Sequence, residues 1–311
     1  MERVPRRIQS PANGSTARAH GLWSAPLPLR IWHVASMDAP TVAVVWSLGF
    51  AWVAGVHLPA WAPILLALVA WSIYIGDRLL DAYAGMRTPP RHQLRDRHTF
   101  HWRHRRILAP LALVAAGASV WIVITRVPPG SRVPDSAIAA ATLVYFSGVH
   151  SRYRLPVSLE RMLSPFCTKA FLVGTLFTAG CLLPVWSQLR ATGAPISHGR
   201  LLIAPALFFA VLGWLNCHAI AQWESARPDT AVHGLTSITL VAAFAGLLLA
   251  VFVAFIEPRP AILIALGSAS AFLLALLDRL RTRLTSLALR AAADLVLLSP
   301  AMLIAFEYAA R

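Results

Sequence analysis

Two aspartates, Asp77 and Asp81, lie four residues apart where a long apolar stretch runs into a basic segment. Four residues are about one helical turn, so on a helix the two carboxylates share a face. Acidic side chains at the boundary between hydrocarbon and water are costly to bury and are often functional. Such a pair can hold a divalent cation, and the cation can hold a phosphate group. The alternative is a helix end that meets water, with salt bridges to arginines such as Arg78 or Arg87.

A second polar group closes another apolar stretch in the other half of the chain. Asn216 and Glu224 lie there, eight residues apart, at the end of the segment 200–223. Glu224 offers a further carboxylate for a cation. It is equally well explained as an interfacial charge near Arg227. The chain therefore carries two polar clusters, each at the end of an apolar segment.

The elements that must position these clusters are membrane helices. The chain has 311 residues, of which 57% are hydrophobic, and a mean hydropathy of +0.62, whereas soluble domains are about 45–50% apolar. Backbone groups in lipid must be satisfied internally, so each apolar segment predicts a helix. We expect an all-α polytopic protein: a disordered cytosolic tail over 1–27 and one transmembrane domain over 28–311. About nine spans are predicted, at 31–55, 61–83, 107–126, 135–152, 163–184, 200–223, 234–256, 260–278 and 288–308.

The net charge of +15 arises from 28 basic and 13 acidic residues. The arginines fall in short loops between apolar segments, which points to membrane topology and anionic lipid headgroups rather than to nucleic acid. With nine spans and a cytosolic N-terminus, twenty basic residues lie inside and six outside. This asymmetry predicts a cytosolic N-terminus and an external C-terminus. The excess of arginine over lysine favours a bacterial source, and hence a bacterial inner membrane. Both polar clusters then face the cytosol.

Nine helices, with cytosolic polar clusters ending the second and the sixth, resemble the UbiA superfamily of intramembrane prenyltransferases. The first motif of that family reads N-D-x-x-D-x-x-x-D. Asp77 and Asp81 match its last two aspartates, and Arg78 stands in the place of the family's arginine. Ile73 and Tyr74 stand where the family has the Asn-Asp pair. The first motif is therefore half complete.

The second motif of the family is matched in a similar way. Asn216 corresponds to its first position and Glu224 to its last, whereas Cys217 and Ile220 occupy positions where the family usually has aspartate. These departures leave roughly half of the negative charge that the family places around its metal ions, so a magnesium site here should be weaker.

The resemblance implies transfer of a prenyl group from an allylic diphosphate to a lipophilic or aromatic acceptor, assisted by Mg²⁺. It implies that Asp77, Asp81 and Glu224 hold magnesium at the catalytic site. Residues that would bind the diphosphate or support the metal are Arg78, Arg152, Arg154, Lys169 and Asn216. The alternative is a non-catalytic UbiA-like membrane protein that binds or moves an isoprenoid or another lipid. The partners are then an isoprenoid diphosphate, its acceptor and membrane lipids.

Three histidines, His98, His101 and His104, recur every three residues in the loop after the second segment. On a helix they could bind zinc or another transition metal. Neighbouring arginines repel a cation, however, and Phe100 and Trp102 between them are typical of an amphipathic interfacial helix. In UbiA-type folds this loop caps the cavity, so a lid helix is the other interpretation.

Overall fold

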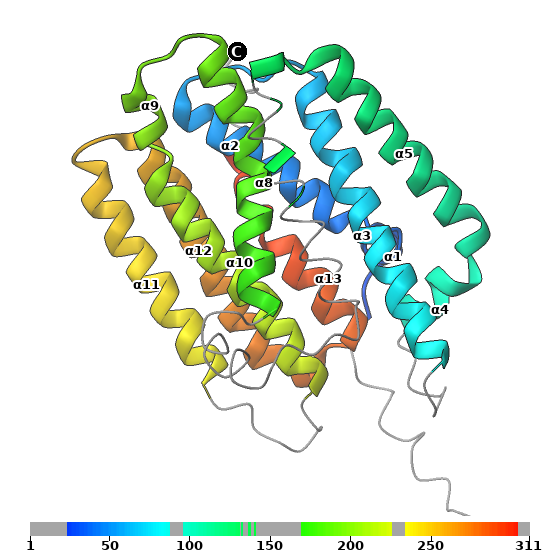
Figure 1. Cartoon of the computed structure of the whole chain (residues 1–311). Coiled ribbons are helices and arrows are strands. Elements are labelled where there is room, and N and C mark those ends of the chain that lie inside the picture. Colours follow the sequence, from blue (N-terminus) through cyan, green and yellow to red (C-terminus); the bar gives the residue numbers. More distant parts are fainter. Residues whose placement is uncertain are drawn as a thin grey trace, which may run out of the picture.

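The computed structural model describes residues 24–87, 96–130, 132, 136, 137, 140, 169–225 and 234–303. Within these ranges the protein is helical and contains no β-strand. Six helices are long and apolar enough to cross a membrane, which indicates an integral membrane protein. They are α3 (Trp61–Arg87), α5 (Arg105–Arg126), α8 (Lys169–Ala191), α10 (Ile203–Ser225), α11 (Leu235–Ala254) and α12 (Pro258–Leu280), and they run side by side as a bundle (Figure 1).

The first predicted span, 31–55, is broken in the structure. Helix α1 (Leu27–Val34) and helix α2 (Asp38–Ala54) meet at an angle of 90°. Ser36, in the corner between them, has a φ of +61°, a left-handed conformation that is uncommon for residues other than glycine. If this bent pair counts as one span, the described residues contain seven.

The count of about nine spans is not confirmed. The predicted span 135–152 lies almost wholly outside the described residues. The last predicted span, 288–308, begins as helix α13 (Ser286–Val296), which ends after 11 residues and gives way to turns. Eleven residues reach about 17 Å, short of the roughly 30 Å of hydrocarbon in a bilayer. Residues 1–23 of the predicted tail also lie outside the described part.

Trp46, near the start of the described chain, contacts α10 and the segment that follows α13. The ring of Trp46 on α2 stacks on Phe209 of α10, with centroids 3.9 Å apart. Its indole nitrogen donates a hydrogen bond of 2.8 Å to the Leu297 carbonyl, just after α13. Trp46 and Phe50 are fully buried. Both ends of the chain therefore contribute to one core.

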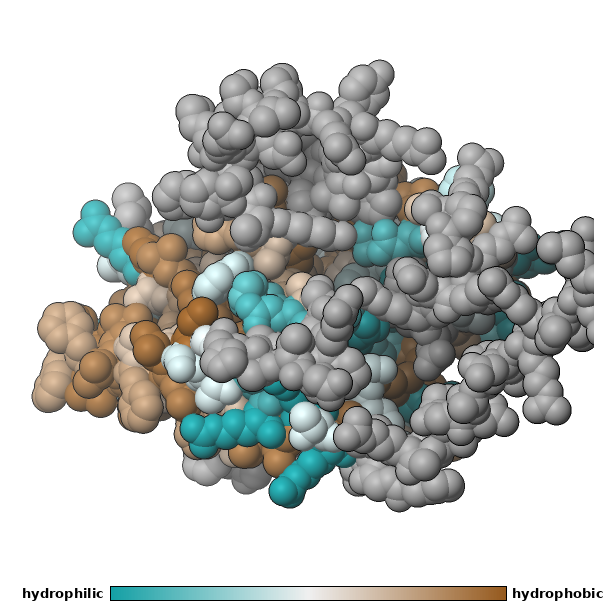
Figure 2. Space-filling view, turned by 90° about the horizontal axis from the view of Figure 1, so that it is seen from below, coloured by the Kyte–Doolittle hydropathy of each residue, from teal (hydrophilic) through white to brown (hydrophobic). Residues whose placement is uncertain are grey.

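The outer helices expose large apolar side chains. Leu113, Val114 and Trp121 of α5 are each more than two-thirds exposed. An apolar surface of this extent marks contact with lipid or with a partner. Hydrophilic residues instead gather at one end of the bundle, seen from below in Figure 2. Two short helices, α4 (Asp96–Arg103) and α9 (Ile196–Arg200), and the 3₁₀ turn η3 (Arg281–Arg283) complete the described elements.

Candidate functional site

A cluster of buried polar side chains gathers residues from five helices. Its members are His33 of α1, Asp38 of α2, Arg78 of α3, Asn216 of α10 and Asp294 of α13, and each is less than a tenth exposed. Burying charged groups is costly unless they are paired or bind an ion. A concentration of this kind inside an apolar bundle is therefore a candidate functional site, and we call it the five-helix cluster.

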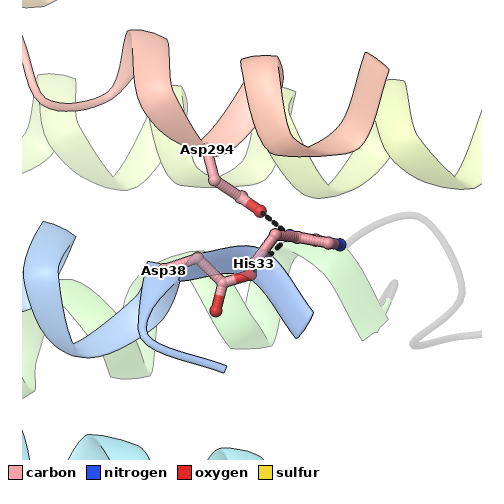
Figure 3. Close-up of side chains that lie close together, drawn as sticks. All are labelled: His33, Asp38 and Asp294. Carbon is pink, nitrogen blue, oxygen red and sulfur yellow. Dashed lines mark ion pairs between the residues drawn. The ribbon is translucent and has the colours of Figure 1, made fainter. Parts of the chain in front are cut away.

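Direct contacts connect the members of the five-helix cluster. The Nδ1 atom of His33 lies 2.8 Å from an Asp38 carboxylate oxygen and 3.5 Å from an Asp294 carboxylate oxygen. Figure 3 shows the two carboxylates approaching His33 from different helices. Arg78 donates to Asp38 over 3.2 Å and to the His33 carbonyl over 3.1 Å. The Asn216 amide nitrogen donates to Asp294 over 3.1 Å.

The corner at Ser36 brings His33 and Asp38 together. The left-handed conformation of Ser36 bends the chain sharply, so two residues on different helices meet. The hydroxyl of Ser36 shares a hydrogen bond of 3.0 Å with Nε2 of His101 on α4, and both residues are fully buried. A non-glycine residue with positive φ costs about 1–3 kcal/mol and persists where the surroundings fix it. Helix α4 therefore helps to hold the corner.

Side chains on one face of helix α3 contact the same corner. Trp71, Tyr74 and Arg78 are spaced three and four residues apart, which places them on one side of the helix. The indole nitrogen of Trp71 donates to the Ala35 carbonyl over 3.1 Å. The guanidinium of Arg78 lies over the Tyr74 ring, 4.4 Å from its centroid. The ring and the carboxylate of Asp38 together fix the orientation of Arg78.

Burial raises the pKa of the Asp294 carboxyl, because the charged form loses its hydration, and the neighbouring charge of Asp38 acts in the same direction. Hydrogen bonds from His33 and Asn216 partly oppose this shift. Helix α13 is not one of the six helices that are long and apolar enough to cross a membrane. The carboxylate at Asp294 would therefore gain from a positively charged partner.

The structure brings two of the sequence-predicted site residues, Arg78 and Asn216, into the five-helix cluster. Asp77 and Asp81 lie half-buried on α3, on either side of Arg78 in sequence. Glu224 forms an ion pair with Arg290 of α13, and both side chains are largely buried.

The remaining predicted diphosphate ligands are basic. Arg152 and Arg154 lie outside the described residues, and Lys169 begins α8 but its side chain is not described.

The sequence does not single out His33 or Asp38. Asp294 lies four residues after Arg290, a spacing that predicts a structural ion pair on the last helix rather than a site, whereas in the structure Asp294 contacts His33 and Asn216. The available signal was the presence of ionisable residues inside apolar segments, because His33 and Asp38 fall within 31–55 and Asp294 within 288–308. Nothing local to the three residues indicates that they meet. Their proximity requires the bend at the α1–α2 corner and the packing of α13 against α1, α2 and α10.

The histidines of the α4 region make protein contacts. His101 bonds to Ser36. Nδ1 of His104 lies 2.9 Å from the carbonyl oxygen of Phe100, one turn earlier, and the His98 side chain is outside the described part. These contacts place α4 against the end of the bundle that carries the cluster. Zinc binding by the three histidines stays a prediction.

A separate buried carboxylate, Asp278 at the end of α12, illustrates a fully satisfied polar group. It accepts hydrogen bonds from the Trp223 indole, the Thr236 hydroxyl and the Arg281 guanidinium. Its three partners come from α10, α11 and η3. We interpret Asp278 as a structural bridge between helices.

Comparison of the chain with models of known protein families, with curated proteins and with solved structures gives no match. The function must therefore be inferred from the residues and their geometry.

Proposed function

We propose that the protein is a UbiA-like intramembrane prenyltransferase, which moves a prenyl group from an allylic diphosphate to a lipophilic or aromatic acceptor. The observation that carries this proposal is the meeting of the two motif-bearing helices. Arg78 of α3 and Asn216 of α10, which lie far apart in sequence, belong to one buried polar cluster. The arginine-rich loops favour a cytosolic location for this end of the bundle in a bacterial inner membrane.

The donor atoms of the predicted site fit magnesium in part. Asp77 and Asp81 offer carboxylate oxygens, the ligand type that Mg²⁺ prefers, and Mg²⁺ commonly binds one or two carboxylates while it keeps several waters. Glu224 fits less well, because Arg290 already neutralises its charge. We therefore assign Mg²⁺ to Asp77 and Asp81, where it would neutralise the charge of the departing diphosphate.

The other residues bind and shield the substrate. Arginine binds phosphate oxygens through two parallel hydrogen bonds, and Asp38 and Tyr74 hold the Arg78 guanidinium in a fixed orientation. Arg152, Arg154 and Lys169 remain the further candidates for the diphosphate. The apolar bundle excludes water, which would otherwise capture an allylic cation.

A second candidate is a UbiA-like protein that binds or moves an isoprenoid or another lipid without catalysis. The ion pairs Arg78–Asp38 and Arg290–Glu224 favour it, because each arginine has a carboxylate partner within the protein. In such a protein the charged groups would hold the helices together, and only the apolar surfaces would contact the ligand.

The test uses purified protein in lipid nanodiscs with Mg²⁺ and a panel of allylic diphosphates of different chain lengths. Diphosphate release is compared for wild type, Asp77→Asn, Asp81→Asn and the control Glu257→Gln, which alters an exposed carboxylate at the start of α12. Loss of a metal ligand should lower the rate by about a hundredfold, at least the effect of losing an outer-shell partner. The control should keep the wild-type rate.

Two outcomes would contradict the enzyme. Release that is unchanged in both aspartate variants would remove the catalytic assignment of Asp77 and Asp81. Tight binding of a labelled isoprenoid without any diphosphate release from the panel would favour the non-catalytic lipid-binding protein.

A further inference from the structure

We propose that His33, Asp38 and Asp294 form a binding site for a divalent transition-metal ion, distinct from the magnesium assigned to Asp77 and Asp81. One donor atom of each residue lies within 4.8 Å of the others. Ligand atoms about 2.0–2.1 Å from a tetrahedral zinc ion are roughly 3.3 Å apart. The observed separations of 2.8 and 3.5 Å from His33 Nδ1 to the two carboxylates bracket that value.

One buried atom that lacks a hydrogen-bond partner points to a missing ligand near the cluster. The Asn216 amide nitrogen donates to Asp294, but its buried oxygen has no hydrogen-bond partner among the described residues. Leaving a buried polar atom unsatisfied costs about 1–3 kcal/mol. The carboxylates of Asp38 and Asp294 also converge on Nδ1 of His33, at 2.8 and 3.5 Å. A cation bound there would be held by both carboxylates and the imidazole.

The mixture of donors indicates the class of metal. One imidazole nitrogen and two carboxylates suit zinc, iron or manganese, because imidazole selects transition metals. Magnesium, by contrast, prefers ligand sets made of oxygen alone. The carboxylates are also held as metal ligands usually are, by hydrogen bonds from neighbouring groups. Arg78 and the Ala39 backbone donate to Asp38, and Asn216 donates to Asp294.

The site draws its ligands from three helices, of which α13 is distant in sequence from α1 and α2. The α1–α2 corner supplies His33 and Asp38, and the last described helix supplies Asp294. A bound metal would therefore connect α13 to the corner and tighten the packing of the bundle. This consequence does not depend on prenyl transfer, so the metal site and the proposed enzyme can fail separately.

The experiment measures zinc binding to the full chain, purified in detergent without a histidine tag and stripped of metal with a chelator. Zn²⁺ bound per chain is determined by mass spectrometry, and affinity by competition with a coloured chelator. Wild type should bind one tightly held Zn²⁺ that millimolar Mg²⁺ does not displace. His33→Asn and Asp294→Asn should weaken the affinity at least tenfold.

His57→Asn is the matched control, since His57 is exposed beyond the far end of α2. It should bind zinc as wild type does. The double variant His98→Asn/His104→Asn should also retain the zinc, because the α4 histidines do not belong to this site. Circular dichroism and gel filtration identify any variant that fails to fold.

If a variant fails to fold, a spectroscopic measurement on the wild-type protein still tests the metal site. X-ray absorption at the zinc edge should show nitrogen and oxygen ligands near 2.0–2.1 Å, including one imidazole and no sulfur. Several results would overturn the site: no stoichiometric zinc in wild type, displacement by Mg²⁺, sulfur ligation, undiminished affinity in a folded His33→Asn variant, or loss of zinc in the α4 double variant.

Discussion

Arg78 and Asp38 form an ion pair that is almost wholly withdrawn from solvent. Replacing a buried ion pair by apolar residues can be nearly neutral, whereas removing one partner leaves an uncompensated charge. The side chain of Arg78 therefore matters for stability whether or not it also contacts a substrate. Experiments at this residue must separate the two roles.

Arg78→Met should lower the free energy of unfolding by about 3–5 kcal/mol, because Asp38 then remains buried without its guanidinium. The double variant Arg78→Met/Asp38→Asn should recover part of that loss. Denaturant unfolding in detergent, followed by tryptophan fluorescence, gives both values. Arg126→Met, at an exposed position, should change stability little. A loss in the double variant as large as in Arg78→Met would contradict the pairing.

Variants of Glu224 and Arg290 distinguish a structural role of Glu224 from a catalytic one. A double-mutant cycle with Glu224→Gln and Arg290→Gln should give a coupling energy of about 0.5–3 kcal/mol, as contacting residues do. If Glu224 holds magnesium as well, Arg290→Gln should leave diphosphate release measurable while Glu224→Gln abolishes it. Equal rates in the two single variants would exclude Glu224 from the metal site.

At the scale of single residues, only part of the candidate site could be predicted from the sequence. Asp77, Asp81, Arg78 and Asn216 stand at motif positions near helix ends, which is a local property. His33 and Asp294 belong to the candidate site because they lie close together in the fold. Their positions in the sequence do not predict this proximity. The pairing of Glu224 with Arg290 likewise depends on how α10 and α13 pack.

Two elements, α8 and α10, pack closely through glycines. A Cβ atom on Gly174 would lie 2.8 Å from the Ala210 carbonyl oxygen and from the Trp214 backbone nitrogen. Small residues allow helix backbones to approach in membranes. Because the obstacles are backbone atoms, the two helices would have to move apart to accommodate a side chain.

Gly174→Ala should therefore lower stability by about 1–3 kcal/mol, the usual cost of overpacking. Gly180→Ala is a control in the same helix, since a Cβ atom there meets nothing within 4 Å. That substitution should be neutral or stabilising by up to about 1 kcal/mol, because alanine favours helix. Thermal unfolding in the same detergent compares them. Equal effects would mean that the helices do not approach at Gly174.

The α1–α2 corner offers a test of backbone conformation. Ser36→Ala should lose the hydrogen bond to His101 and keep the strain of the positive φ. Ser36→Gly should lose the same bond but relieve strain of about 1–3 kcal/mol. The glycine variant should therefore unfold at the higher temperature of the two. The reverse order would show that the corner is not left-handed.

At the scale of the whole molecule, an all-helical membrane bundle could be predicted, because hydropathy gives the length of each apolar segment directly. The predicted number of about nine spans is not confirmed, because hydropathy does not register a bend and part of the chain lies outside the described residues. Residues 31–55 form an apolar stretch, yet the chain turns by 90° at Ser36. Residues 288–308 are apolar too, yet the helix stops at Val296. In both segments the helix is interrupted although the apolar stretch continues.

Lipid contact can be measured on α5. In a variant with the native cysteines replaced by serine, a spin label at Leu113→Cys should collide with dissolved oxygen far more than with a water-soluble nickel complex, because the position faces hydrocarbon. Thr192→Cys, at an exposed position between the candidate spans Ala170–Ala191 and Ser197–Glu224, should show the opposite preference. A label at position 113 that the nickel complex reaches freely would place α5 outside the bilayer.

The bond from Trp46 to the Leu297 carbonyl joins residues 251 positions apart. During synthesis the first helices leave the ribosome long before the last one exists. The partners of His33 and Trp46 at the opposite end of the polypeptide, Asp294 and Leu297, are therefore synthesised last. Folding is completed only after translation has passed Leu297, and nascent chains that stall before that point would expose an imidazole and an indole group without these partners to the cell's quality-control machinery.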